Sequence, residues 1–276
     1  MRKKKLINFI NFTNFRHFLE NNKRDLIISL SSNDNNLKVW NINNFECLVN
    51  LKNINEKGYL YSAILFNDNQ NNSDYKYIIT SNGESRENCE SIKLYDMKGE
   101  KVKNLNDSNW CTFFIDSYYD KKLDTYYILT GNLGYVKSYN YNMNKAYHIY
   151  NDNDNKYHNS IVINDKGRIV KLIDSSCNGE VKIWDFHFGK LLEKILVSND
   201  WLKGISLFNN DYLFVSCKDK TIKLIDLKSA KIIQTVYGHS NYVICVKIIF
   251  HPNYGKCLIS QGAYDDGIKL WKIKSQ

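Results

Sequence analysis

The sequence predicts an all-β fold built from six similar four-stranded sheets, on three observations. One short motif recurs along the chain at steps of 55, 44, 45, 41 and 46 residues, and steps of about 40 to 45 residues are typical of a four-stranded repeat. Short apolar runs stand one turn before the motif, and they are too short for ordinary helices. The chain has one Pro and 20 Tyr, and its aromatic share is 14%, which favours strands.

Each copy of the motif is expected to form the third strand of its sheet. The copies are LKVWNI from Leu37, IKLYDM from Ile92, VKSYNY from Val136, VKIWDF from Val181, IKLIDL from Ile222 and IKLWKI from Ile268. Repeated sheets of this kind bury their faces only against their neighbours, so a ring of them uses the whole chain. We therefore expect a single domain over residues 1–276.

The last repeat carries a longer signature than the others. Gly238 and His239 stand before its first strand, and Trp271 lies in its third strand. A Gly-His pair at one end and a Trp at the other resembles the WD40 repeat. The resemblance covers almost the whole chain and implies a WD40 β-propeller of six blades, each with four antiparallel strands. It also implies a buried hydrogen-bond network of Asp, His, Ser or Thr, and Trp in each blade.

The other repeats match this signature less closely. The family's turn aspartate is matched by Asp34, Asp219 and Asp265, and Asn178 is a near substitute. Even in the last repeat, the family's spacing places Gln261 where the Ser or Thr of the network is expected. The resemblance therefore implies an incomplete network in this blade.

The N-terminus offers a way to close the ring. The stretch KKLINFINFTNF aligns without a gap on KIIQTVYGHSNY, which contains the fourth strand of the fifth repeat. We therefore expect Leu6–Ile10 to pair with Ile268–Ile273, which completes the last blade and removes an exposed strand edge. The alternative is an open six-bladed scaffold, similar to coat and nuclear-pore proteins, that a strand from a partner completes.

The positive charge does not favour a nucleic-acid partner. The formal net charge is +9, but only five of the 38 basic residues are Arg, the side chain that suits base and phosphate recognition best. One Lys holds the same place in every copy of the motif, so these charges should be spread around the ring. These residues are Lys38, Lys93, Lys137, Lys182, Lys223 and Lys269.

Catalytic and metal-binding motifs are missing from the sequence. It contains no GxSxG, no GxxxxGK[ST], no HExxH and no dinucleotide-binding fingerprint. We therefore expect no enzyme activity, no small-molecule substrate, no cofactor and no metal. The seven Cys form no CxxC pair, and no apolar run has the length of a membrane span. Reduced thiols indicate the cytoplasm, with the nucleus as the alternative.

An aromatic residue recurs at one position in all six repeats, just before the expected first strand. These residues are Phe15, Tyr59, Trp110, Tyr157, Trp201 and Tyr242. The resemblance places this position on the top face, around the mouth of the central channel, where many WD40 proteins bind peptides. The neighbouring Arg16, His17, His158 and Lys203 are expected to add polar or anion contacts. The alternative is that the six rings fill the gaps between blades.

Large amphipathic rings on a rigid rim suit protein binding, because Trp and Tyr bury much area and dominate interface hot spots. A rigid ring also loses little conformational entropy when it binds. The sequence therefore predicts a non-catalytic scaffold that holds protein or peptide segments on its top face. We expect it to act as a monomer or as a subunit of a larger complex.

Overall fold

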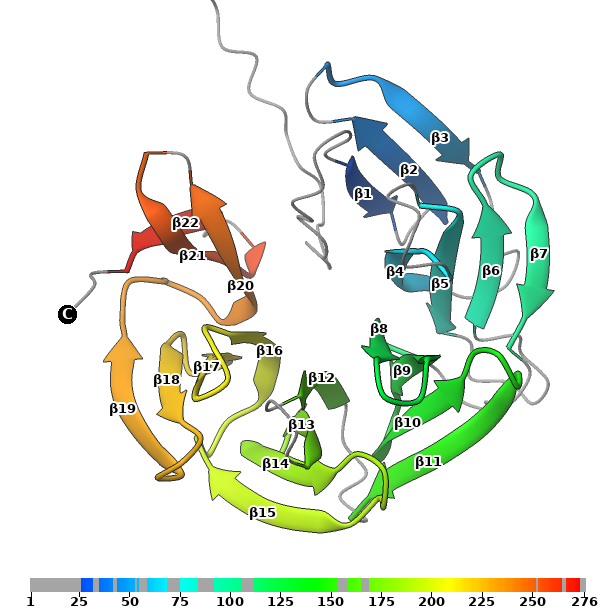
Figure 1. Ribbon diagram of the computed structural model, residues 1–276. Coiled ribbons are helices and arrows are strands. Elements are labelled where there is room, and N and C mark those ends of the chain that lie inside the picture. The colour runs from blue at the N-terminus through cyan, green and yellow to red at the C-terminus, as the bar shows by residue number, and fades with distance from the viewer. Residues whose placement is uncertain are drawn as a thin grey trace, which may run out of the picture.

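The computed structural model describes most of the chain from residue 26 onward. The described residues are 26–31, 35–41, 44–52, 54, 59–68, 75–83, 92–105, 112–152, 158–164, 169–251, 253–264 and 267–273. They form 22 β-strands in six antiparallel sheets. Figure 1 shows the sheets arranged around a ring, in chain order.

The strands follow one another across each sheet in chain order. The first sheet contains β1 (Leu26–Ser31), β2 (Asn36–Asn41) and β3 (Cys47–Leu51). The second contains β4 (Tyr59–Phe66), β5 (Tyr77–Gly83), β6 (Ile92–Asp96) and β7 (Lys101–Asn104), and the third β8 (Phe114–Asp120), β9 (Thr125–Gly131), β10 (Tyr135–Asn140) and β11 (Lys145–Asn151). The fourth contains β12 (His158–Asn164), β13 (Val170–Ser176), β14 (Glu180–Asp185) and β15 (Leu191–Leu196). The fifth contains β16 (Leu202–Leu207), β17 (Tyr212–Cys217), β18 (Ile222–Asp226) and β19 (Lys231–Val236), and the sixth β20 (Val243–His251), β21 (Gly255–Gly262) and β22 (Ile268–Lys272).

This architecture confirms the all-β propeller of six blades. Every copy of the recurring motif forms the predicted third strand, from β2 to β22. Four sheets have four strands, and among the described residues the first sheet lacks an innermost strand and the last an outermost one. The predicted partner of β22, Leu6–Ile10, lies outside the described residues.

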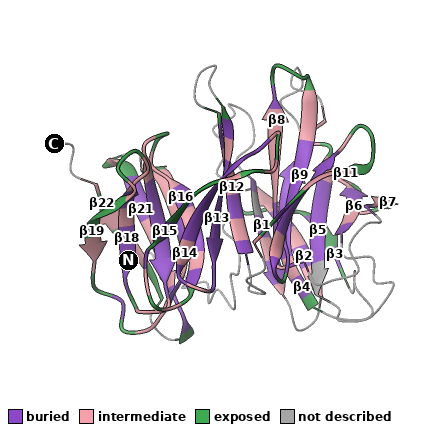
Figure 2. Ribbon diagram, turned by 90° about the horizontal axis from the view of Figure 1, so that it is seen from below, coloured by how far each residue is buried: buried purple, intermediate pink, exposed green. Residues whose placement is uncertain are grey.

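The core lies between neighbouring sheets. Val181 and Ile183 of the fourth sheet, for example, pack in one buried cluster with Leu213 and Val215 of the fifth. Middle strands such as β13 and β14 are buried on both faces, and their sequences are therefore rich in consecutive apolar residues. In the outer strands β3 and β15, most residues are exposed. Figure 2 shows the buried colour along the middle strands and the exposed colour on several turns.

The last sheet contains the polar network that the sequence predicted to be incomplete. The Ser260 hydroxyl lies 2.7 Å from both Nε1 of Trp271 and Nε2 of His239, and the indole N–H donates to it. The expectation for Gln261 was therefore wrong by one residue. Side chains alternate along a strand, so Ser260 points toward Trp271 and Gln261 points to the opposite side of the sheet.

Two of the four residues predicted at the turn-aspartate position, Asp219 and Asn178, lie among the described residues. Asp219, between β17 and β18, accepts hydrogen bonds from the backbone N–H of Thr221 at 3.0 Å and from the Lys223 ammonium. Burial alone would raise the pKa of Asp219, but its hydrogen bonds outweigh burial and lower that pKa to about 2. Asn178 accepts from the backbone N–H of Glu180 at 3.1 Å, so it does replace an aspartate in its turn. Asp34 and Asp265 lie outside the described residues.

Candidate binding rim and central cavity

Three of the six predicted rim aromatics are described, and each stands at the start of an innermost strand. Tyr59 is the first residue of β4, while Trp201 and Tyr242 directly precede β16 and β20. Tyr59 is 54% exposed and Trp201 38% exposed, and Tyr242 is half-buried. The innermost strands of a propeller run in the same direction, so the three residues share one face. We call the face on which the innermost strands begin the top face.

Four of the predicted site residues lie outside the described residues. They are Phe15, Arg16, Trp110 and Tyr157. His17, expected to lie beside them, is outside the described residues as well.

Trp201 and Tyr242 are linked by a lysine from a neighbouring turn. The ammonium of Lys218 lies 4.5 Å from the centre of the Trp201 ring and 6.0 Å from the centre of the Tyr242 ring. Lys203, predicted to lie beside the rim, places its ammonium 4.8 Å from the same Trp201 ring. The indole thus interacts with two cations. The junction of the fifth and sixth sheets therefore presents an aromatic and basic surface.

Tyr264 extends this surface, although it was not among the predicted residues. Its ring centre lies 5.8 Å from that of Tyr242 at an angle of 81°, and the Tyr242 hydroxyl donates to its oxygen at 3.5 Å. This hydrogen bond raises the pKa of Tyr242. Tyr264 is 79% exposed. We name Trp201, Lys203, Lys218, Tyr242 and Tyr264 the rim cluster.

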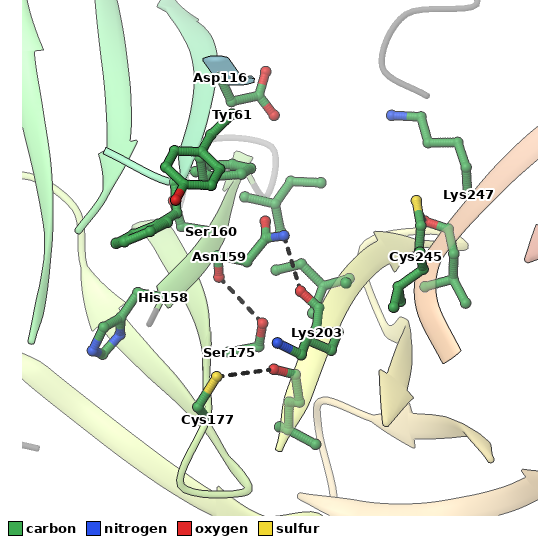
Figure 3. Close-up of a pocket in the computed structure, with 18 residues that line it drawn as sticks. Tyr61, Asp116, His158, Asn159, Ser160, Ser175, Cys177, Lys203, Cys245 and Lys247 are labelled. Atoms are coloured by element: carbon green, nitrogen blue, oxygen red, sulfur yellow. Dashed lines mark hydrogen bonds between the residues drawn. The ribbon is translucent and has the colours of Figure 1, made fainter. Parts of the chain in front are cut away.

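His158 lies below the exposed rim, in the lining of the central cavity (Figure 3). Its residue is only 3% exposed, and its Nδ1 lies 2.9 and 2.8 Å from the two carboxylate oxygens of Asp174. The imidazole starts β12 beneath the rim, where a buried ring needs a polar partner. The structure therefore gives His158 a role in fixing the first two strands of the fourth sheet.

A second aromatic group lies where the second and third sheets meet. Tyr61 lies 6.4 Å from Tyr59 and 4.8 Å from Phe113, measured between ring centres. Phe113 directly precedes β8. The sequence predicted Trp110 as the aromatic residue before this strand. Tyr61 could have been found from the sequence, because residues two apart on a strand share a face.

The innermost strands surround a cavity of about 430 Å³ below this rim. Its walls come mainly from β4, β8, β12, β16 and β20, with Ser175 of β13, and they include Tyr61, Asn159 and Lys203. Figure 3 shows Asp116 and Lys247 on opposite sides of the cavity. The amide of Asn159 donates to the backbone carbonyl of Lys203 at 3.1 Å and so ties the fourth sheet to the fifth.

Polar and charged side chains form part of the cavity lining. Its lining contains two lysines and one aspartate, and the Ser160 hydroxyl is buried with no hydrogen-bond partner among the described residues. The described part of the chain holds no cluster of three His, Cys, Asp or Glu side chains able to bind a metal ion. It also contains no helix with the length and apolar character of a membrane span.

Comparison with known proteins gives a family match in the last repeat. The family model described as "WD domain, G-beta repeat" matches residues 230–272. Over 114 residues the chain is 26% identical to the U3 small nucleolar RNA-associated protein 21 homolog of Schizosaccharomyces pombe, which covers 41% of this chain and 12% of that protein. Over 99 residues it is 32% identical to WD repeat and SOCS box-containing protein 1 of Danio rerio, covering 35% of this chain and 22% of that protein.

Solved structures show the same architecture. The crystal structure of the WD40 beta propeller domain of Doa1 superposes with a TM-score of 0.70 at 15% sequence identity. The superposition covers 89% of this chain and 75% of the other chain. At this identity the likeness establishes the fold. The chain spans less than a quarter of either curated relative, at 12% and 22% of their lengths.

Proposed function

We propose that this chain, whose last repeat matches the WD-repeat family model and whose sheets form a six-bladed β-propeller, binds a segment of a partner protein on its top face. The observation that carries the proposal is the rim cluster. Two exposed aromatic residues, Trp201 and Tyr264, flank the half-buried Tyr242, and two lysines contact the Trp201 ring.

The chemistry of the rim cluster supports an interface. Trp and Tyr combine a large apolar area with few rotatable bonds, so they gain contact area at low entropic cost. Lys203 and Lys218 can pair with carboxylates of the partner while their alkyl stems cover the rings. Tyr59 stands on the same face at the second sheet. A partner segment that crosses the mouth of the central cavity could therefore contact several sheets.

The proposed mechanism is preorganisation. Trp201 is fixed by the hydrogen bond from its backbone N–H to Asp200 Oδ1 at 2.8 Å, and the next residue, Leu202, is 2% exposed. The anchor thus extends from a buried strand and loses little freedom on binding. We propose a non-catalytic role on this basis. The five described cysteines are all free thiols, which supports a place in the cytoplasm, with the nucleus as the alternative.

The test is affinity purification with the Trp201→Ala, Tyr242→Ala double variant. It should lose one or more partners that the wild-type protein retains, because two of the three aromatic rings of the rim cluster are removed. The matched control is Tyr254→Ala, which removes a ring that is 52% exposed at the β20–β21 turn on the opposite face. Circular dichroism and thermal melting should show that all variants are folded. Partners retained equally by the double variant and the wild type would refute the proposal.

A further inference from the structure

Several turns on the face opposite the rim cluster carry exposed apolar side chains, among them three turns of the third and fourth sheets. Turns between first and second strands and between third and fourth strands lie at the same end of an antiparallel sheet, which we call the bottom face. Leu123 in the β8–β9 turn is 54% exposed, Met143 in the β10–β11 turn 74% and Phe188 in the β14–β15 turn 82%. Figure 2 shows the exposed β8–β9 turn projecting beyond its sheet. We name these three residues the bottom tips.

Each bottom tip is the third residue after a side chain that orders the turn. Asp120 Oδ1 accepts from the backbone N–H of Lys122 at 2.8 Å and from that of Leu123 at 3.2 Å. In the other two turns, Asn140 Oδ1 accepts from the N–H of Met143 at 3.0 Å, and Asp185 Oδ1 accepts from that of Phe188 at 3.0 Å. The backbone of each turn is thus fixed by a local cap.

The turn geometry does not require an apolar residue at this position. In the fifth sheet, Asp226 orders the equivalent β18–β19 turn and accepts from the N–H of Ser229 at 3.4 Å. The third residue there is an exposed serine. The bottom tips therefore have no role in forming their own turns, and their exposure shows that they add little to the core.

The turns of the third and fourth sheets are also held against each other. Asp120, whose side chain is 1% exposed, places Oδ2 3.0 Å from Nε2 of His187, the neighbour of Phe188. The Tyr147 hydroxyl lies 3.2 Å from Nδ1 of the same histidine. One buried carboxylate thus fixes the positions of both Leu123 and Phe188.

Lysines surround the bottom tips. Lys121, Lys122, Lys145 and Lys190 flank the three tips in sequence, and all four are exposed. The nearby acids have partners of their own. Asp120 and Asp185 cap turns, and Asp124 accepts from the Tyr119 hydroxyl at 2.5 Å. Asp120 and Asp185 are buried, at 1% and 7% exposure, whereas Asp124 and the four lysines are exposed. The exposed charges beside the apolar tips are therefore four lysines and one aspartate.

We propose that the bottom tips and their lysines bind the surface of an anionic lipid bilayer. Separate apolar tips that project from a face need a deformable apolar medium, whereas a protein partner would need a matching pocket for each tip. Basic residues close to the tips are attracted to anionic headgroups, and weak insertion combined with charge is a recognised mode of peripheral binding. The contact is peripheral and leaves the top face accessible, so it does not depend on the proposed protein binding.

The test is sedimentation of the full chain with vesicles of phosphatidylcholine alone and of phosphatidylcholine with phosphatidylserine. The wild type should sediment only with vesicles that contain phosphatidylserine, and added salt should weaken this binding. The Leu123→Ser, Met143→Ser, Phe188→Ser variant should lower the partition coefficient about tenfold or more, because it removes the inserting groups. The matched control is Ile233→Ser on the outer strand β19, where an exposed side chain, 52% accessible, lies away from the turns. It should bind as the wild type does.

Several results would overturn the proposal. They are equal binding to both kinds of vesicle, no binding to either, wild-type binding by the triple variant, or equal loss in the control. If the triple variant still binds vesicles but loses a protein partner, the turns belong to a protein interface. If the triple variant does not fold, Phe188→Trp provides a second readout. Its emission, taken as the difference from the wild type, should shift to the blue with anionic vesicles, and an unchanged spectrum would refute insertion.

Discussion

At the scale of single residues, the Ser260 hydroxyl links its own strand, β21, to β22 and to the connection that precedes β20. The residue is 2% exposed and contacts His239 from the connection before β20 and Trp271 from β22. A comparable bond occurs in the first sheet, where the Trp40 indole N–H donates to the Ser29 hydroxyl at 2.8 Å. In both sheets, the serine two residues before the end of a strand, β1 or β21, accepts from the Trp of the next strand.

Replacing Ser260 with Ala should lower the free energy of unfolding by about 1–3 kcal/mol, because two polar groups lose this partner in a dry environment. Urea unfolding followed by circular dichroism measures the change. Ser229→Ala is the control, since its exposed side chain should matter by less than about 0.5 kcal/mol. Equal effects of the two substitutions would show that the hydroxyl network does not stabilise the blade.

At the scale of strands, the lysine shared by the recurring motif has a structural use. In three sheets its ammonium reaches the connection that precedes the innermost strand of the same sheet. Lys93 donates to the carbonyl of Ile54 at 3.4 Å, Lys182 to Asp152 Oδ1 at 2.7 Å and Lys269 to the carbonyl of Gly238. The predicted spread of these lysines around the ring is confirmed, because each lies in a different strand from β2 to β22. Their ammonium groups help hold the loops of the top face.

Asp152→Ala should therefore be strongly destabilising. It leaves the Lys182 ammonium, whose side chain is fully buried, without its carboxylate, and the loss of one partner from a buried ion pair costs about 3–5 kcal/mol. Lys182→Met should cost less, because the thioether fills similar space without a charge. Chemical denaturation of the two variants compares these costs. A larger loss for Lys182→Met than for Asp152→Ala would contradict this account of the pair.

The strands could be predicted from the sequence because the motif and the apolar runs repeat with a nearly constant step. Contacts between turns of different sheets could not be predicted in the same way. Lys218 and Tyr264 join the rim cluster from turns after β17 and β21, and no periodic pattern marks such residues. The spacing placed Gln261 in the network where Ser260 lies. An error of one residue along a strand is enough for this, because successive side chains point to opposite faces of the sheet. The burial of His158 against Asp174 could not be predicted either, because position in a strand does not reveal a buried partner.

At the scale of the whole molecule, closure of the ring by the N-terminus remains a prediction. The edge of β22 that does not pair with β21 has no partner strand among the described residues, and Ile268 and Leu270 on that strand are 42% and 45% exposed. We infer that Leu6–Ile10 covers this edge, so that residues 1–276 form one domain. In the alternative, an open scaffold, a partner supplies the strand.

An Ile7→Pro, Asn8→Pro variant tests this closure. Adjacent residues point their N–H groups to opposite edges of a strand, so one of the two prolines must remove a donor from the pairing with β22. The isolated variant should melt at a clearly lower temperature than the wild type, with a loss of about 3 kcal/mol. Arg2→Pro, Lys3→Pro is the control outside the predicted strand. Unchanged melting of the first variant would support the open scaffold.

The central claim is that protein partners bind across the top face at the rim cluster. The most direct measurement places a photo-crosslinking amino acid at position 242 and, in a second protein, at position 254 on the bottom face. The account predicts that irradiation in cells joins a specific protein to position 242 and leaves position 254 without that adduct. The same adduct from both positions, or none from position 242 in a folded protein, would contradict it.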